Sequence, residues 1–235
     1  MVRGWTKSGL VAAFCALGMT AGQAAAADLG HGPSIKDAPV STGYSWSGFY
    51  VGGHAGLANG SADASLALFN TETDLTGALY GVHAGYNFQR GAHVFGIEGS
   101  WSRSNVEGST QCFFVITCTG EVDWVATLVG RAGLAMNHTL LYGFGGVAWG
   151  KVNAVGSLGP VFTLSGDETH TGWTAGFGLE HALNERVSFR IEYAHIDLGS
   201  ETHNLTGSGF PVSIPVKVDA TLDTVRLGVN VKLTH

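Results

Sequence analysis

Six charged residues carry the strongest chemical signal in this chain. They lie in segments where apolar and polar residues alternate, on the set of positions opposite the apolar ones: Glu98, Arg131, Glu180, Arg190, Glu192 and Arg226. A charge removed from water is costly unless it is paired, and the three acids match the three arginines in number. If these positions face the inside of a closed sheet, we expect a salt-bridged, hydrogen-bonded plug. An ion pathway lined by the same charges is the alternative.

Two cysteines form a second candidate site. Cys112 and Cys118 are separated by five residues, which include Phe113 and Phe114. In an exported protein an even pair in one connector predicts a disulfide bond, and a zinc site is the weaker alternative because no histidine pair lies nearby. The enclosed apolar tip is expected to be either a contact surface for a partner or a segment that folds over the rim or dips into lipopolysaccharide.

The backbone pattern that positions these residues has a period of two. Near the C-terminus, apolar residues alternate with polar ones from Thr224 to Leu233, and similar alternation covers 173–180 and 187–194. A period of two sends the two sets to opposite faces of a strand. The polar set consists largely of glycine with isolated Glu and Arg, which suits a narrow barrel interior better than an open surface.

Eight such segments are present, and the connectors between them alternate between long and short. The predicted strands cover about 46–58, 77–89, 93–105, 121–136, 139–153, 170–183, 186–199 and 217–233. The long connectors are 61–76, 106–120, 154–169 and 200–216, and the tight ones are 90–92, 137–138 and 184–185. This pattern predicts an all-β fold, an eight-stranded antiparallel up-and-down transmembrane β-barrel with four outer loops. Trp46, Phe49 and Tyr50 are expected in an aromatic girdle at the periplasmic rim.

The N-terminus and the composition indicate export to a membrane. Residues 1–27 have a cationic start, an apolar stretch from Leu10 to Met19 and a small-residue cleavage site, which predicts a Sec-type signal peptide. Residues 28–45 are expected to be a periplasmic lead-in, and residues 46–235 the barrel domain. The formal net charge of −6 argues against nucleic acid as a partner, because binding to phosphates requires a basic surface.

Several motifs resemble one family in particular. They include WSGFYVGG (46–53), GVHAGYNFQ (81–89), LLYGFGGVAWG (140–150), VSFRIEYAHIDLG (187–199) and TVRLGVNVKL (224–233). Together they resemble the alphaproteobacterial outer-membrane β-barrel family of surface immunogens, porin-family proteins with an OmpA-like transmembrane fold. The resemblance implies insertion by the barrel-assembly machinery, which recognises a C-terminal aromatic residue in such proteins, whereas this chain ends Leu233–Thr234–His235.

The function expected from the sequence is non-catalytic. It combines a contribution to envelope integrity, within outer-membrane lipid and lipopolysaccharide, with display of surface loops. Alternatives are binding of haemin or a host surface by those loops, with His170 and His203 in or beside them, and a small-solute porin. No metal or other cofactor is predicted. His195 with Asp197 is the one pair that suggests catalysis, but no nucleophile accompanies it.

Overall fold

The structure, a computed structural model, describes residues 44–66, 69–113, 116–158, 162–207 and 213–233. The chain divides into two units, residues 1–40 and 41–235, and the described residues all belong to the second. The predicted signal peptide at 1–27 and most of the predicted lead-in at 28–45 lie outside the described residues, so both stay predictions. In the described part of the chain, no helix is long and apolar enough to cross a membrane.

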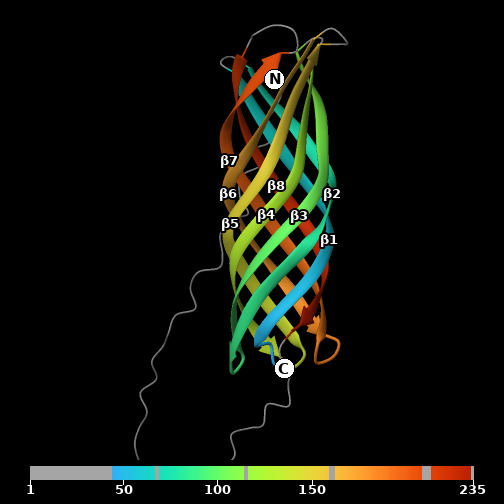
Figure 1. Cartoon of the computed structure of the whole chain (residues 1–235), viewed down its shortest axis with the longest axis vertical. Helices are drawn as coiled ribbons and strands as arrows, with labels where there is room; N and C mark the ends of the chain where they lie inside the picture. Colours follow the sequence, from blue (N-terminus) through green and yellow to red (C-terminus); the bar gives the residue numbers. More distant parts are fainter. Residues whose placement is uncertain (1–43, 67–68, 114–115, 159–161, 208–212, 234–235) are drawn as a thin grey trace, which may run out of the picture. The chain divides into compact units, whose positions relative to one another are not determined.

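Eight antiparallel strands close into a barrel in which each strand pairs with its neighbours in sequence and β8 pairs with β1 (Figure 1). The strands are β1 (Gly48–Leu66), β2 (Phe69–Arg90), β3 (His93–Phe113), β4 (Ile116–Met136), β5 (Thr139–Leu158), β6 (Phe162–Ala182), β7 (Val187–Gly207) and β8 (Ser213–Lys232). The predicted all-β, eight-stranded, up-and-down architecture is confirmed.

Three connectors are tight turns at one end of the barrel, here called the turn end. The turn between β2 and β3 contains Gly91 at a φ of 61°, and the turn between β4 and β5 contains Asn137 at a φ of 55°. Glycine and asparagine tolerate this left-handed backbone, which sharp reversals require. The pairing of Tyr50 with Lys232 places the start of β1 and the end of β8 at the turn end as well.

The prediction of four long outer loops is wrong over most of their length, because these residues form strands. The ladder between β1 and β2, for example, continues to the pair Leu66 and Phe69. The four predicted loops at 61–76, 106–120, 154–169 and 200–216 are therefore mainly strand in the described residues. The prediction assumed that the apolar set faces outward along the whole strand, whereas the apolar set changes sides.

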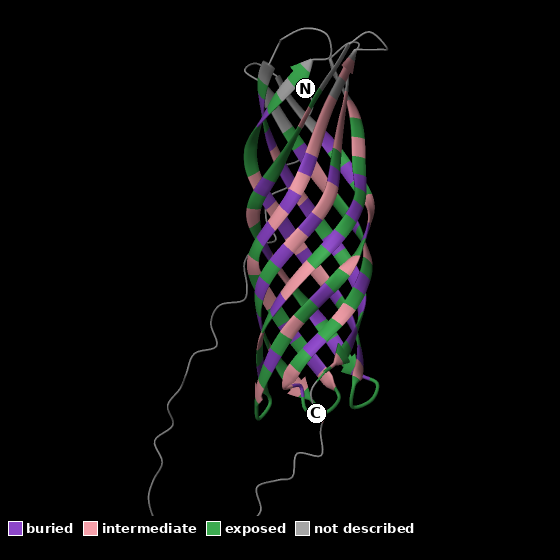
Figure 2. Cartoon of the chain, in the orientation of Figure 1, coloured by how far each residue is buried: buried purple, intermediate pink, exposed green. Residues whose placement is uncertain are grey.

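Strand β8 makes this change of side visible. Val225, Leu227 and Val229 face outward and are 51%, 49% and 46% exposed, whereas Val218 and Leu222 on the same strand are buried inside. The outward apolar residues on the turn-end side of the barrel form what we call the apolar belt. Through the belt, buried or partly buried residues alternate with more exposed ones along the strands (Figure 2). The half of the barrel farther from the turn end is here called the outer half. The strands thus face an apolar medium in the belt and water in the outer half.

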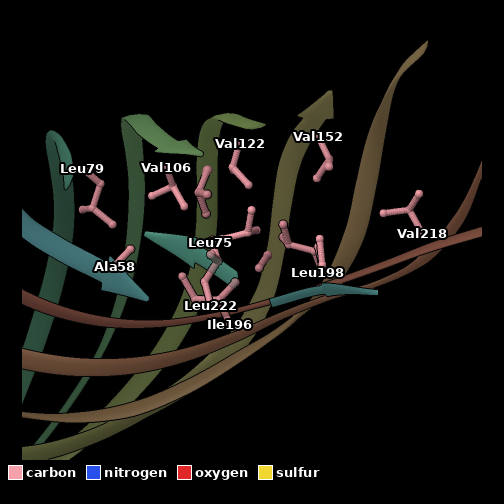
Figure 3. Close-up of a cluster of buried hydrophobic side chains, with 14 of the residues drawn as sticks. Ala58, Leu75, Leu79, Val106, Val122, Val152, Ile196, Leu198, Val218 and Leu222 are labelled. Atoms are coloured by element: carbon pink, nitrogen blue, oxygen red, sulfur yellow. The ribbon is translucent and has the colours of Figure 1, made fainter. Parts of the chain in front are cut away.

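The interior of the outer half is packed with hydrophobic side chains, here called the apolar plug (Figure 3). Its buried members are Ala58, Ala62, Leu75, Leu79, Val106, Val122, Val125, Ala148, Val152, Ala194, Ile196, Leu198, Val216, Val218, Ala220 and Leu222. These residues come from every strand except β6. The outer half therefore has apolar residues inside and polar residues outside, as a water-soluble barrel does.

The plug generates a stability prediction. Leu75 is 1% exposed, and Leu75→Ala should lower the free energy of unfolding by about 2–5 kcal/mol, because it leaves a cavity in a packed core. Urea unfolding of the refolded barrel measures the change. Asn59→Ala, at an exposed outward position on β1, is the control and should stay within about 0.5 kcal/mol of the wild type. Equal unfolding midpoints for the two variants would show that the plug is not packed.

Candidate functional site

The interior of the belt contains all six charged residues predicted from the sequence, and the structure brings them together. Glu98 lies at the centre of one group, where one oxygen, Oε2, accepts hydrogen bonds from Arg131 Nη1 at 3.1 Å and Arg190 Nη1 at 2.7 Å. Tyr50 donates its hydroxyl to the same oxygen at 2.6 Å. The side chains of Glu98 and of both arginines are at most 8% exposed. A buried carboxylate is thereby paired with two guanidiniums.

Glu180 forms the next part of the network. Its Oε2 accepts a hydrogen bond from Arg131 Nη2 at 3.0 Å, so Arg131 bridges two carboxylates. Its other oxygen accepts hydrogen bonds from Ser188 Oγ at 2.5 Å and Asn230 Nδ2 at 2.6 Å. Every described partner of this carboxylate is a donor from the barrel wall, as a desolvated anion requires.

Glu192 holds the loosest part of the network. It accepts a hydrogen bond from the Tyr142 hydroxyl at 2.7 Å, and its oxygens lie 3.4 Å from Arg190 Nη1 and 3.6 Å from Arg226 Nη2. Arg226 is thus the only one of the three arginines whose ion pair exceeds hydrogen-bond length in the described residues. We expect Arg226 to contribute less to stability than Arg131 or Arg190.

Two tyrosines in this network were missed by the sequence analysis. Tyr50 was assigned to the girdle, which is wrong, because it is buried and bound to Glu98 and Arg131. Tyr142 lies under Arg131, whose Cζ is 3.9 Å from the ring centroid. The signal was present in the pattern, since Tyr50 shares its set of alternate positions with inward residues of β1. A Cβ at Gly178 would lie 2.7 Å from the Tyr142 hydroxyl, so glycine there makes room for the ring.

The turn end of the bore is closed by residues that precede β1. Trp46 was also assigned to the girdle, but only Phe49 of that trio is exposed, at 57%, whereas Trp46 is 4% exposed inside the barrel. Tyr44 packs edge-on against Trp46, and Lys232 lies over the Tyr44 ring. The backbone N–H of Trp46 donates to Gln89 Oε1 at 2.7 Å, which fixes this segment against β2.

Between the charged network and the plug lie two stacked histidines. His54 Nδ1 is 3.1 Å from His83 Nδ1, and both rings are buried. The remaining nitrogens are also satisfied, His54 Nε2 by Ser102 Oγ at 2.8 Å and His83 Nε2 by Asn230 Oδ1 at 2.5 Å. These histidines continue the polar wall rather than present a free ligand atom.

The described cavities inside the bore are small. One of about 10 Å³ is lined by residues of the charged network, including Glu98, Arg131 and Arg226, and another of about 10 Å³ lies near Trp46. A cavity of this size holds roughly one water molecule. Side chains therefore fill the bore around the charged network and near Trp46, and the apolar plug lies in the outer half.

Two histidines that the sequence predicted to lie in or beside the outer loops are buried inside the barrel, on strands. His170 on β6 and His203 on β7 are 0% exposed, and their Nε2 atoms are 2.8 Å apart. Burial first, and the neighbouring His203 second, lower the pKa of His170 below its usual value. A neutral His170 ring is therefore favoured, and a ligand would have to open the barrel to reach either histidine.

The pairing predicted for His195 is also corrected. His195 Nδ1 lies 2.9 Å from Asp223 Oδ1 on β8, not against Asp197. Asp197 instead accepts a hydrogen bond from Trp173 Nε1 at 3.2 Å and caps the backbone N–H of Gly199 at 2.8 Å. No described residue supplies a serine or cysteine nucleophile to His195.

The remaining predicted site lies at the outermost tip between β3 and β4. Cys118 takes part in a disulfide bond, whereas the side chains of Cys112, Phe113 and Phe114 lie outside the described residues. The Cys112–Cys118 bond and the Phe113–Phe114 contact surface therefore stay predictions. Among the described residues, no group of three or more His, Cys, Asp or Glu side chains could hold a metal ion.

Comparison with known proteins assigns the family. The family model described as outer membrane protein beta-barrel domain matches residues 12–232. The chain belongs to this outer-membrane barrel family. The 31 kDa outer-membrane immunogenic protein of Brucella melitensis is 32% identical to it, covering 96% of this chain and 99% of that protein. The 22 kDa outer membrane protein of Rhizobium leguminosarum is 30% identical, covering 84% of this chain and 82% of that protein.

A solved structure supports the fold alone. The outer membrane protease OmpT of Escherichia coli superposes with a TM-score of 0.52 at 8% identity, covering 79% of this chain and 96% of that chain. As a member of the outer-membrane barrel family, the protein lies in the outer membrane, and its relatives include outer-membrane immunogenic proteins. The apolar belt therefore faces lipid, and the polar outer half projects beyond it.

The network of this outer-membrane barrel generates a graded prediction. Arg131→Met should lower the free energy of unfolding by about 3–5 kcal/mol, because it leaves Glu98 and Glu180 without a shared cation. Arg226→Met, whose ion pair is longer, is the matched comparison and should cost less. Unfolding in urea, followed by tryptophan fluorescence, measures both. An equal loss in the two variants contradicts the network as described.

A second prediction concerns the tip between β3 and β4. Mass spectrometry of non-reduced protein extracted from membranes should find Cys112 joined to Cys118, because no other cysteine follows the predicted signal peptide. Reduced and alkylated protein is the control. Recovery of Cys112 and Cys118 as free thiols in the non-reduced sample would exclude the bond.

Proposed function

We propose that this protein is a sealed, non-catalytic outer-membrane barrel that contributes to envelope integrity and holds a rigid β-structured outer half above the membrane. The observation that carries the proposal is the filled bore. Ion pairs among Glu98, Arg131 and Arg190 occupy the belt, and the apolar plug occupies the outer half. An eight-stranded barrel is only wide enough for side chains to fill it.

The apolar plug weighs against the porin alternative in particular. Conduction requires water along the whole bore, and a constriction lined by hydrophobic side chains excludes water. Leu75, Leu222 and Ile196 are each at most 2% exposed within the plug. An ion that passed the charged network would still face this desolvated segment. The haemin alternative gains no support from His170 and His203, because both are buried.

The rigid outer half supports a role in surface display. Polar outward residues such as Glu107 and Glu121 lie directly opposite each other on paired strands, so the outer half presents a β-sheet surface rather than long loops. The ladder between β1 and β2 is continuous to the pair Leu66 and Phe69, and the ladder between β3 and β4 reaches the pair Phe113 and Ile116 with two register shifts. A paired backbone resists proteolysis because cleavage requires local unfolding.

Planar-bilayer recording tests the sealed bore. Refolding is first checked by the change in gel mobility on heating. The refolded protein should then show no unitary current steps in about 1 M potassium chloride. An open porin reconstituted in the same way is the control for insertion. Stable, reproducible steps from the wild type would refute the sealed barrel.

Envelope integrity is tested in cells. A strain lacking the protein should become more sensitive to detergent and to large hydrophobic antibiotics, and expression of the wild type should restore resistance. The destabilised Arg131→Met variant is assayed at the same abundance in the membrane as the wild type. It tests whether resistance depends on the stability of the barrel and not only on the amount of protein. Unchanged sensitivity in the deletion strain contradicts the proposed role.

A further inference from the structure

A cluster of polar and aromatic side chains lies on the outward surface of β6, β7 and β8, where the apolar belt ends. It consists of Trp173, Tyr193, His195, Asp197 and Asp223, which we call the rim cluster. The strands are paired in register here, Trp173 with Asp197 and His195 with Asp223. Below it lie exposed belt residues such as Phe177, and above it the polar outer half begins. The rim cluster thus lies at the level of lipid headgroups.

Hydrogen bonds within the cluster fix its members in place. Asp223 Oδ1 accepts the Tyr193 hydroxyl at 2.6 Å and contacts His195 Nδ1 at 2.9 Å. Trp173 donates its indole N–H to Asp197, and its ring centroid is 5.4 Å from that of His195. Side chains held by such contacts lose little conformational entropy when a ligand binds.

Two polar atoms of this ordered group remain open. Among the described residues, no hydrogen bond reaches Asp223 Oδ2 or His195 Nε2. The side chains of Asp223 and His195 are 52% and 36% exposed, and Trp173 is 50% exposed. His195 directs Nδ1 at Asp223 and leaves Nε2 open for a hydrogen bond, and Asp223 Oδ2 is an open acceptor of the same cluster.

Another part of the rim differs in charge. Arg103 on β3 pairs with Trp124 in the ladder, so that part offers a cation to lipid phosphates, whereas Lys151 on β5 is held by Asp167 on β6 at 2.7 Å. The rim cluster has two carboxylates and neither lysine nor arginine. Carboxylates beside an anionic leaflet are unfavourable unless they meet donors, and hydroxyl groups are donors that carry no charge.

We propose that the rim cluster binds the saccharide headgroup of an outer-leaflet glycolipid. The faces of Trp173 and Tyr193 pack against the apolar C–H face of a sugar ring, since both rings are flat and amphipathic. Asp223 Oδ2 accepts a hydrogen bond from one sugar hydroxyl, and His195 Nε2 forms a hydrogen bond with another. Phosphate groups of the same lipid are directed away from the carboxylates. This binding is independent of the sealed bore, because the cluster lies on the outer surface.

An ordinary aromatic girdle is the competing explanation, and the other rim tryptophans show the difference. In the described residues the indole N–H groups of Trp101, Trp124 and Trp149 make no hydrogen bond, whereas that of Trp173 is bound to Asp197. A girdle needs only amphipathic rings at the interface. It does not require a paired His195 and Asp223 with open polar atoms.

Glycolipid retention in nanodiscs tests the proposal. The barrel is embedded in phosphatidylcholine containing a small fraction of purified lipopolysaccharide, and the lipopolysaccharide bound per barrel is measured by native mass spectrometry. A Trp173→Ala, Asp223→Ala variant should bind about tenfold more weakly or worse, because it loses a charged acceptor and a stacking surface. The matched control, Trp149→Ala with Asp219→Ala, should bind within about twofold of the wild type.

Competition identifies the recognised group. Oligosaccharide freed of its acyl chains should displace lipopolysaccharide from the wild type, whereas phosphatidylglycerol should not. Each variant must first show heat-modifiable gel migration, so that a misfolded barrel is not counted. Equal retention by the cluster variant and the wild type, an equal loss in the control variant, or displacement by phosphatidylglycerol each overturns the proposal. Current steps in planar bilayers would refute the sealed bore and would not bear on this result.

Discussion

The rest of the structure depends on the need to pair every backbone N–H and C=O group inside the hydrocarbon layer. Lipid offers no hydrogen bonds, so a spanning sheet must close on itself, as β8 does when it pairs with β1. Closure with eight strands fixes a narrow bore. Inward side chains must then fill that bore, and any charge among them must find a partner. The bridging of Glu98 and Glu180 by Arg131 follows from this requirement.

The surrounding medium decides which set of alternate residues is apolar. Along β8 the backbone keeps its period of two, yet Val225 and Leu227 face lipid while Ala220 and Leu222 face the interior of the outer half. Neither arrangement exposes a large apolar surface to water. Because the apolar set changes sides within one strand, the outer half continues from the belt without a hinge between the two. The rim cluster lies at this level, where apolar, aromatic and charged outward residues meet.

Sequence reasoning worked where one rule applied along the whole segment. The period of two and the tight turns around Gly91 and Asn137 predicted the strand count and the closed fold. The same parity placed Arg190 and Glu98 on the inner face. Reasoning failed where the medium changed, since Val216 and Val218 lie on the face that the belt rule assigns to polar residues. It also misplaced Tyr50, whose aromatic type suggested the girdle although its position in the alternation was inward.

Partner choice is harder to predict than the face of a strand, because it depends on register between strands. His195 and Asp197 are close in sequence, but they lie on the same strand and so are not partners across a ladder. Asp223 on β8 lies directly opposite His195. Exposure then separates the histidine pairs by what each is able to bind. His170 and His203 contact each other through their Nε2 atoms in the interior, where a ligand must first break the barrel. His195 is held by Asp223 at the rim with its other nitrogen open, so a headgroup reaches it without any change in the fold.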